Sequence, residues 1–312
     1  MMRRMKSTKT IIDPTAELIP LQHFEGHSGP IYDIDFDDQF VYSAAADCFV
    51  TRWNRSTGEQ DAFAIRCEAV PFSIQLFSNA KKLAIGLSTG QVHIVDIEQK
   101  QELHHFTQHQ AGIFAMFETQ DKHLLCVGDA DGYLSVWETA TMKLLIILPL
   151  SCGKIRSIRQ LNETSILIAG GTGEVLVLET EFFNELHRFY AHEGGTSVLC
   201  VDRTRNELIT GGKDGYLRWW DLETFALKKA LPAHKGTIYG LEFIDKEHFA
   251  SVSRDKSVKI WKASERMVIE KLSDKSSGHR RSINALCSNE NGQFAYAGDD
   301  KMIHLFQFGK QD

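Results

Sequence analysis

Three parts of the chain each contain a histidine, a hydroxyl residue, an aspartate and a tryptophan at similar intervals. The three sets are His27, Ser43, Asp47 and Trp53; His192, Thr210, Asp214 and Trp220; and His234, Ser251, Asp255 and Trp261. A hydroxyl, an imidazole and a carboxylate are the groups that form and activate the nucleophile of serine hydrolases. A hydrolase needs one such set, whereas a scaffold can use the same residues in every repeat. We therefore interpret the three sets as structural hydrogen-bonding groups.

Each set belongs to a sequence repeat that recurs seven times. In the clearest copy, residues 208–221, two apolar runs flank a turn that contains Gly211, Gly212, Asp214 and Gly215. Such runs around a glycine–aspartate turn are typical of a β-hairpin. The last large apolar residue of each copy recurs at intervals of 42, 42, 41, 42, 41 and 45 residues: Trp53, Val95, Trp137, Leu178, Trp220, Trp261 and Phe306. A period in the low forties predicts the four-stranded blades of a β-propeller.

The repeat also opens and closes with recurring dipeptides. Gly26-His27 opens one copy, and Trp220-Asp221 closes another. In these features the chain resembles the WD40 repeat family over residues 17 to 308. The resemblance implies an all-β, seven-bladed propeller in which the tryptophan indole bonds the hydroxyl, the hydroxyl bonds the imidazole and the imidazole bonds the carboxylate. Each link would contribute about 1 kcal/mol to stability.

The polar set is incomplete in the other four copies. In the third and seventh copies, Val127 and Tyr296 stand where the hydroxyl is expected, and Phe306 replaces the last tryptophan. These two copies therefore keep only part of the set. The second and fourth copies lack the histidine and the aspartate, so we expect apolar packing to hold those blades.

The copies define one propeller over residues 15–308, after a flexible N-terminal tail over residues 1–14. The predicted repeats span about residues 25–64, 65–106, 107–148, 149–190, 191–231, 232–272 and 278–308. The seventh copy lacks an outer strand, and the strand-like segment 17–24 lacks a blade. We expect this segment to complete the last blade and to close the ring. The insertion at residues 273–278 is either a binding loop or a tolerated long connection.

The composition, with 43% hydrophobic and 24% charged residues in 312, is that of an ordinary soluble globular protein. The net charge of −6 disfavours nucleic acid as a partner, and the chain has no run of 18 apolar residues that would span a membrane. The six cysteines form no C-x-x-C pair, and the basic N-terminus lacks the apolar core of a secretion signal. We therefore expect reduced thiols, a cytoplasmic location and a chain that is monomeric on its own.

Three short segments imitate ligand-binding motifs. Residues 129–132 place a glycine fourth, whereas an EF-hand calcium loop has its glycine sixth. Residues 170–173 are rich in glycine but lack the lysine of a phosphate loop and precede a strand. His104, His105 and His109 have no acidic or thiol partner at the spacing of a metal site. We predict no cofactor and no metal.

The predicted innermost strands align on their apolar residues, with residues 31–34 as the template. The second position of this alignment should face the mouth of the central channel. Around the ring it is occupied by Tyr32, Phe72, Phe114, Arg156, Ser197, Tyr239 and Asn284. Aromatic residues and arginine are enriched in the hot spots of protein interfaces. Lys213, Arg254 and Asp299, each one residue before a turn aspartate, should surround the same face and add charge selectivity.

The resemblance to WD40 proteins implies that this rim receives a peptide or side chain of another protein. We therefore expect a non-catalytic protein–protein interaction scaffold that binds a protein segment on the narrow face of the propeller. In one alternative, the rim rings only cap the inner core. In a second, they stack on RNA bases, with an affinity that falls steeply with salt. An enzyme is the third alternative, although the predicted rim has no histidine and no carboxylate for acid–base chemistry.

Overall fold

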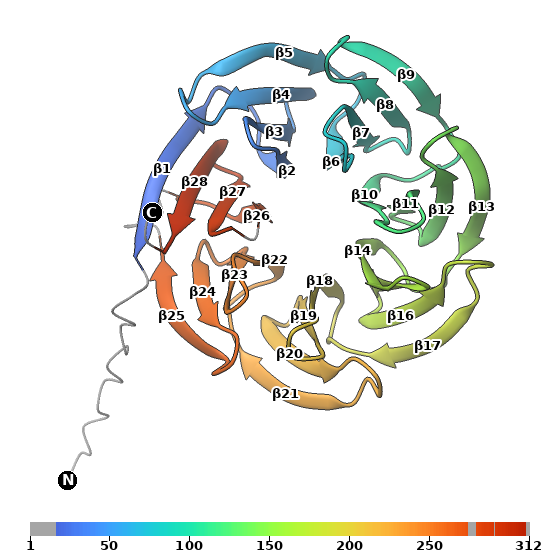
Figure 1. Cartoon of the computed structure of the whole chain (residues 1–312), viewed down its shortest axis with the longest axis vertical. Coiled ribbons are helices and arrows are strands. Elements are labelled where there is room, and N and C mark those ends of the chain that lie inside the picture. Colours follow the sequence, from blue (N-terminus) through green and yellow to red (C-terminus); the bar gives the residue numbers. More distant parts are fainter. Residues whose placement is uncertain (1–16, 274–278, 290, 310–312) are drawn as a thin grey trace.

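The computed structural model describes residues 17–273, 279–289 and 291–309. Its regular structure consists of 28 β-strands, which form seven four-stranded antiparallel sheets. The sheets are arranged as blades around a central axis, with one strand of each blade at the centre and another at the circumference (Figure 1). This arrangement confirms the predicted all-β, seven-bladed propeller. None of the described residues forms a helix of the length and hydrophobicity that a membrane span requires.

Blades one to six each take four consecutive strands from the axis outward. The innermost strands of the seven blades are β2 (Ile31–Phe36), β6 (Pro71–Leu76), β10 (Ile113–Glu118), β14 (Ile155–Asn162), β18 (Thr196–Asp202), β22 (Ile238–Phe243) and β26 (Ile283–Ser288). The remaining strands of blades one to six are β3 (Phe40–Ala45), β4 (Phe49–Asn54), β5 (Gln60–Arg66), β7 (Lys82–Leu87), β8 (Val92–Asp96), β9 (Gln101–Phe106), β11 (Leu124–Asp129), β12 (Tyr133–Glu138), β13 (Lys143–Pro149), β15 (Ser165–Gly170), β16 (Glu174–Glu179), β17 (Glu185–Tyr190), β19 (Glu207–Gly212), β20 (Tyr216–Asp221), β21 (Leu227–Pro232), β23 (His248–Ser253), β24 (Val258–Lys262) and β25 (Met267–Leu272). Blade seven is completed by β27 (Gln293–Gly298), β28 (Met302–Phe308) and β1 (Leu18–Glu25).

The turn between the second and third strands of a blade contacts the start of the next blade. In blade five this turn contains Gly215, whose φ of 76° lies in the left-handed region that glycine adopts without strain. A Cβ atom at Gly215 would lie 2.4 Å from the carbonyl oxygen of His234. The carbonyl of Gly215 accepts hydrogen bonds from the backbone N–H groups of Ala233 and His234. Glycine is therefore needed at position 215, where the histidine that opens blade six approaches.

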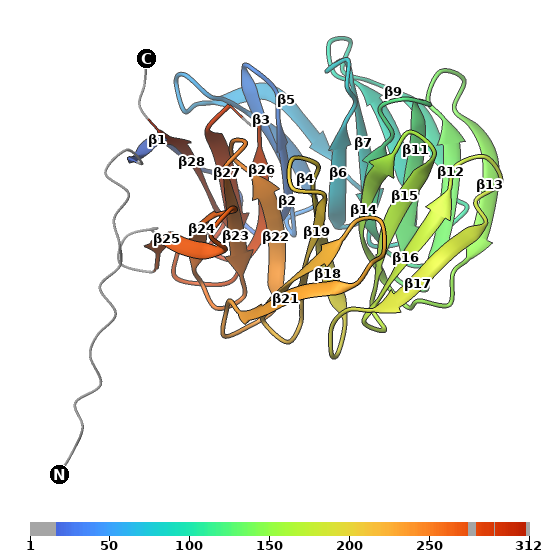
Figure 2. The ribbon, with the colours of Figure 1, turned by 60° about the horizontal axis from the view of Figure 1, so that its bottom comes forward.

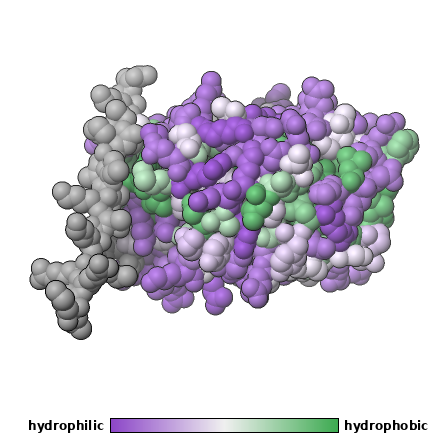
Figure 3. Space-filling model, turned by 90° about the horizontal axis from the view of Figure 1, so that it is seen from below, coloured by the Kyte–Doolittle hydropathy of each residue, from purple (hydrophilic) through white to green (hydrophobic). Residues whose placement is uncertain are grey.

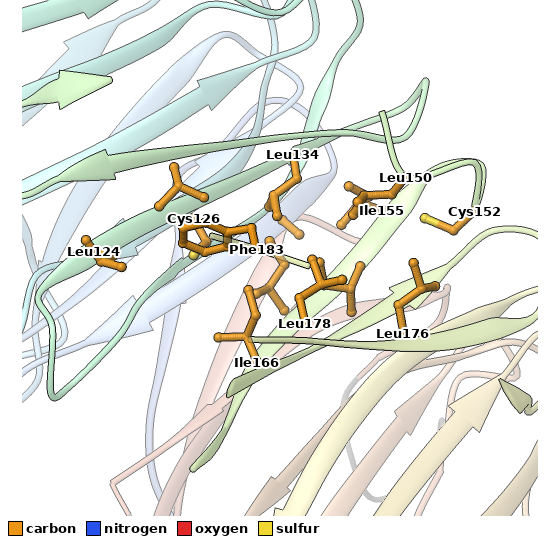
Figure 4. Packing of buried hydrophobic residues seen from close by; sticks show 14 residues of the cluster. Leu124, Cys126, Leu134, Leu150, Cys152, Ile155, Ile166, Leu176, Leu178 and Phe183 are labelled. Carbon is orange, nitrogen blue, oxygen red and sulfur yellow. The ribbon is translucent and has the colours of Figure 1, made fainter. Parts of the chain in front are cut away.

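The hydrophobic core lies between the blades. Seven clusters of buried residues each join two neighbouring blades, and together they run around the ring. Figure 4 shows the cluster between blades three and four, where Cys126 and Leu134 lie against Ile166, Leu176 and Leu178. Burial of apolar surface stabilises the fold by about 25 cal/mol per Å². A sheet buries its two faces only when the neighbouring blades are in place, so each blade depends on its neighbours for stability.

The first and last strands close the ring. β1 pairs with β28 in antiparallel register, from Leu18 opposite Phe308 to Glu25 opposite Met302. The predicted closure by the segment 17–24 is therefore confirmed. This pairing gives β28 a partner on both sides, and β1 becomes the outer strand of the last blade.

The closing strand also packs against the first blade. Phe24 is 1% exposed, and the centre of its ring lies 6.1 Å from that of Trp53. The last blade is thus fastened to the first by side chains as well as by the strand pairing. The expected tail, residues 1–14, lies outside the described residues, as does the insertion at 273–278 apart from Ser273.

The outermost strands run around the circumference of the ring (Figure 2). Along β13 the residues alternate between exposed and half-buried, so one face of this strand is the more covered. Polar side chains cover most of the side seen in Figure 3, and hydrophobic side chains form small separate groups on it. Exposed hydrophobic residues on these strands include Leu145, Ile147, Leu186 and Leu227. A concave surface lies instead at the axis of the ring.

Candidate functional site

The polar set of blade one forms a chain of hydrogen bonds. His27 Nδ1 lies 2.9 Å from Asp47 Oδ2, and His27 Nε2 lies 2.8 Å from Ser43 Oγ. The indole N–H of Trp53 donates to the same hydroxyl over 2.8 Å. The structure thus brings the four residues together in the order that the family resemblance implies.

Blade five repeats this chain and adds an arginine. His192 lies 2.9 Å from Asp214 and 2.7 Å from Thr210. Trp220 donates to the Thr210 hydroxyl over 3.0 Å, and Arg218 donates to Asp214 over 2.7 Å. Burial alone would raise the pKa of Asp214, but hydrogen bonds from His192 and Arg218 outweigh it and hold that pKa well below its usual range. The aspartate is therefore a charged anchor for the imidazole.

Blade six contains the third chain of hydrogen bonds. The burial of its hydroxyl, and of those in the other two sets, indicates the role of these residues. His234 lies 2.7 Å from Ser251 and 3.2 Å from Asp255, and the Trp261 indole donates to Ser251 over 2.8 Å. The hydroxyl residues of all three sets are fully buried. Each hydroxyl also accepts an indole N–H. A hydrolase nucleophile has to reach its substrate, so these sets act as structural links.

Blade three has a complete chain that sequence analysis did not predict. His109 Nδ1 lies 2.8 Å from Asp129 Oδ2, and His109 Nε2 lies 2.7 Å from Ser135 Oγ. Trp137 donates to the Ser135 hydroxyl over 2.9 Å. The prediction that this blade keeps only part of the set was wrong, because Ser135 lies directly opposite Val127 and supplies the missing hydroxyl from the next strand. The sequence did contain a sign of this hydrogen bond. Ser135 and Trp137 are two residues apart, and residues at that spacing lie on the same face of a strand.

Blade seven keeps the histidine and the aspartate only. His279 Nδ1 lies 2.6 Å from Asp300 Oδ1. The ring of Tyr296, which stands at the hydroxyl position, is centred 5.1 Å from the His279 ring. An aromatic contact thus takes the place of the hydroxyl link in this blade.

A cavity of about 500 Å³ opens at the mouth of the central channel, and all seven innermost strands contribute to its wall. The wall includes eight of the residues predicted at the rim: Tyr32, Phe72, Phe114, Arg156, Ser197, Tyr239, Arg254 and Asn284. Lys213 is exposed and lies outside this wall. A concave site of this size, with aromatic rings and a few polar groups, is typical of ligand-binding sites.

Three aromatic rings from neighbouring blades form a row on one side of the cavity. The Tyr32 and Phe72 rings meet edge to face with their centres 5.4 Å apart. The Phe72 and Phe114 rings are stacked with their centres 4.7 Å apart. All three side chains are half-buried, so part of each ring remains accessible from the cavity.

Two cationic side chains of blade four lie beside the last ring of this row. Lys154 Nζ lies 3.9 Å and Arg156 Cζ lies 5.1 Å from the centre of the Phe114 ring, both within the range of a cation–π contact. Burial lowers the pKa of both side chains. Among the residues that the structure describes, neither cation forms an ion pair with a carboxylate. The edge of the cavity beside Phe114 therefore carries positive charge that no acidic side chain in the described part of the chain balances by direct contact.

Asn284 belongs to the closure of the ring as well as to the wall. Its Nδ2 donates to the carboxylate of Asp299 over 2.7 Å and to the carbonyl oxygen of Ile31 over 3.0 Å. Because the bond to Ile31 joins blade seven to blade one, we assign Asn284 a structural role.

The deeper part of the cavity contains charges that sequence analysis missed. Arg159 of blade four and Glu242 of blade six form an ion pair of 2.7 Å across the channel. Asp33 also contributes to the wall, as does Asp299, which sequence analysis had placed around this face. The expectation that this site has no carboxylate was therefore wrong. Each innermost strand has a bulge between its first and third residues, so residues after the aligned second position also face the channel.

Two aspartates of β2 join blade one to blade two. Asp33 accepts the backbone N–H of Ile74 over 2.8 Å, and Asp35 accepts that of Leu76 over 2.9 Å. The second oxygen of each carboxylate accepts a backbone N–H of β2 itself. Burial raises the pKa of Asp33 to about 7 and that of Asp35 to about 6. Because all four oxygens already have backbone donors, we assign both residues to the joint between the blades.

Away from the cavity, one group of described residues offers ligands for a metal. The donor atoms of Glu68, His93 and His105 all lie within 4.8 Å of one another. The spacing along the chain indicated no acidic partner for His105, but the fold brings Glu68 close to it. Glu68 comes from the loop between β5 and β6, so the spacing along the chain did not reveal it.

Five segments of the chain match the family model described as WD domain, G-beta repeat. The matched segments are residues 18–54, 100–138, 183–221, 225–262 and 270–307. Together they cover more than half of the chain.

The chain is also similar to several larger or comparable proteins. It is 22% identical to the striatin homolog of Dictyostelium discoideum, over 94% of this chain and 35% of that protein. It is 23% identical to eukaryotic translation initiation factor 3 subunit I of Brugia malayi, over 66% of this chain and 84% of that protein. The WD repeat-containing protein 55 homolog of Dictyostelium discoideum is 22% identical, over 72% of this chain and 55% of the relative. The aligned region thus spans about a third of the first relative and about half of the third.

Proposed function

The chain belongs to the WD40 repeat family of β-propellers, and on that premise we propose that it is a non-catalytic scaffold that binds a short segment of another protein at the mouth of its channel. The observation that carries the proposal is the cavity of about 500 Å³ with its row of three half-buried aromatic rings. Accessible aromatic side chains in a concave surface are typical of interface hot spots. One of the similar proteins is by name a subunit of a larger factor, which agrees with a role in assembly.

The charges of the wall indicate the chemistry of the bound segment. Lys154 and Arg156 lie beside Phe114 and have no carboxylate partner among the described side chains. A carboxylate of the partner could therefore form charge-assisted hydrogen bonds with them at the edge of the aromatic row. We propose that the segment presents an acidic side chain to blade four and an apolar side chain to the rings of Phe72 and Phe114.

The same residue types could bind single-stranded RNA, but the arrangement of the rings favours a peptide. Base stacking needs free ring faces. The Phe114 ring is already contacted by the stacked ring of Phe72 and by Lys154 Nζ. A peptide side chain can pack against ring edges, whereas a base would have to displace these contacts. A binding affinity that falls by orders of magnitude with salt would instead favour RNA.

The carboxylates in the cavity do not form an obvious acid–base pair. Glu242 is paired with Arg159, Asp299 accepts a hydrogen bond from Asn284, and both oxygens of Asp33 accept backbone N–H groups. A general base needs an oxygen or nitrogen free to reach the proton that it removes. The geometry therefore favours a binding role for this cavity.

Affinity capture with matched variants tests the proposal. The purified protein would be immobilised and exposed to a native lysate of the source cells, beside the rim variant Phe114→Ala with Tyr239→Ala. The matched control is Phe182→Ala with Tyr190→Ala, which also removes one Phe and one Tyr ring, from positions that are 68% and 60% exposed on blade four. We expect the same proteins to bind the wild type and the control but not the rim variant. Capture of the same proteins by a folded rim variant would contradict the proposal.

A further inference from the structure

A pair of stacked histidines lies on the outer part of blade two. His93 on β8 is directly opposite His105 on β9, and their rings are centred 4.4 Å apart with 9° between their planes. Two glutamates accompany the pair: Glu102 on β9, and Glu68 in the loop between β5 and β6. The group therefore combines three separate parts of the chain.

The hydrogen bonds of His93 orient its ring as in a metal ligand. His93 Nδ1 lies 2.6 Å from a carboxylate oxygen of Glu102, and His93 Nε2 lies 3.0 Å from one of Glu68. In a neutral imidazole one nitrogen donates and the other carries a lone pair. When Nδ1–H donates to Glu102, the lone pair of Nε2 points toward the Glu68 carboxylate. A carboxylate that fixes the far nitrogen of a ligating histidine is a recurring feature of zinc sites.

We propose that Glu68, His93 and His105 bind a divalent transition-metal ion of the zinc type, with Glu102 as the residue that positions His93. Their donor atoms lie within 4.8 Å of one another. Zinc bonds to imidazole nitrogen and carboxylate oxygen are about 2.0–2.2 Å long, so tetrahedral ligands lie roughly 3.3 Å apart. The 3.0 Å between His93 Nε2 and Glu68 needs little adjustment to reach that separation.

The third ligand requires a local movement. The planes of the two imidazole rings are nearly parallel, so their lone pairs do not yet converge on one point. His105 is exposed, and its ring can turn without disturbing the core. Solvent would supply the fourth ligand, as it does in zinc sites with three protein ligands. Two nitrogen donors favour zinc, nickel or copper over magnesium and calcium, which prefer oxygen.

The position of the site suggests what the ion would do. In blade two, Pro71 lies opposite Leu87 and Val92 lies opposite Phe106. The start of β6, the turn between β7 and β8 and the end of β9 therefore lie at the same end of the blade. The histidine pair is near this end, which also carries Phe72. A bound ion would fasten the loop between blades one and two to the outer strands of blade two. It would therefore stiffen the ring on the same face as the channel mouth.

Calorimetric titration with zinc chloride tests this site directly. The full chain, prepared without a polyhistidine tag, would be compared with His105→Ala, an exposed substitution outside the core. The matched control is His104→Ala, because His104 is the neighbouring exposed histidine and its ring stacks on Phe106, 6.0 Å away. Magnesium chloride would be titrated as the ion that prefers oxygen ligands.

We expect zinc to bind the wild type and His104→Ala alike, and His105→Ala at least tenfold more weakly. The variant Glu102→Gln should weaken zinc binding by about 10- to 100-fold, since it changes only the residue that positions His93. Cobalt(II) added to the wild type should give the visible absorption of a tetrahedral site, and the spectrum should be absent in His105→Ala. Equal zinc affinity in the wild type and His105→Ala would overturn the proposal, as would an equal loss in both histidine variants.

Discussion

The ammonium group of Lys154 lies 3.9 Å from the centre of the Phe114 ring, at the mouth of the channel. Arg156 lies over the same ring at 5.1 Å. The charge-reversing variant Lys154→Glu with Arg156→Glu should therefore weaken binding of an acidic segment by at least tenfold, because two favourable charges become repulsive. Its free energy of unfolding should change by less than about 1 kcal/mol, as expected for substitutions that break no ion pair.

The control for this prediction changes the net charge equally. Lys143→Glu with Lys229→Glu alters two exposed lysines on outer strands. Fluorescence anisotropy with a labelled acidic peptide from the partner would compare the three proteins. Equal weakening in both variants would mean that net charge, and not the contact with Phe114, controls binding.

The hydroxyl of Ser135 supports the polar chain of blade three, so its removal should destabilise the fold. Ser135→Ala leaves His109 Nε2 and the Trp137 indole without their shared partner, at a cost of about 1–3 kcal/mol. Val127 lies directly opposite Ser135. Adding Val127→Ser places a hydroxyl where blades one, five and six have one. In urea denaturation, the double variant should be more stable than the sum of the two single effects predicts; strict additivity would contradict this account.

The side chain of Phe24 should contribute strongly to the closure of the ring. It is 1% exposed and lies on the strand that completes blade seven, against Trp53 of blade one. Phe24→Ala should lower the free energy of unfolding by about 3–5 kcal/mol. His23→Ala, at the neighbouring exposed position of β1, is the matched control and should be nearly neutral. If both variants melt at the same temperature as the wild type, the strand does not hold the ring closed.

Asp33 should make stability depend on pH in a predictable direction. Burial raises its pKa from 3.8 to about 7, so between these values the folded protein keeps a proton that the unfolded chain has lost. The stability that this group contributes is therefore present at low pH and is lost as pH rises through that window. Asp33→Asn does not titrate, so the wild type should lose stability relative to this variant as pH rises from about 4 to about 8. Urea denaturation across this range measures the difference, with Asp38→Asn, at an exposed position of the same blade, as the control.

The fold was predictable because the information that determines it is local and repeated. Hydrophobic residues near Trp53, Trp137 and Trp220 recur at one period, and each copy specifies a hairpin at the same place in the repeat. Closure was predictable for a related reason, since an unpaired strand edge at one end of the repeats matched a spare strand at the other. These relationships follow from strand pairing and from the burial of edges, and both can be read along the chain.

The polar contacts were less predictable because they depend on distances between strands. The hydroxyl of blade three could come from position 127 or position 135, since either lies within reach of His109 and Trp137. An alignment of the repeats compares one position of each copy. The hydrogen bond requires only a hydroxyl oxygen within reach of the histidine and the tryptophan, and either strand can supply it. The partners Arg159 and Glu242 come from blades four and six, so no spacing along the chain brings them together.

Sequence analysis predicted only some of the residues that face the channel. The aligned second position identified Phe72, Phe114 and Tyr239, which line the cavity. The bulge beside this position also turns later residues toward the axis, and Asp33 was missed for that reason. Lys154 was missed because it precedes the aligned strand, although it lies over the Phe114 ring.

Binding of selected peptides tests the central claim most directly. A random peptide library displayed on phage would be selected on the immobilised wild-type protein, and the affinities of the enriched peptides would be measured in solution. We predict that these peptides carry an acidic residue, bind the control Phe182→Ala with Tyr190→Ala as tightly as the wild type, and bind Phe114→Ala with Tyr239→Ala at least tenfold more weakly. The melting temperatures of all three proteins should agree within a few degrees. Equal affinity for the folded rim variant would contradict a binding site at the channel mouth, and a large loss of its stability would place the two rings in the core.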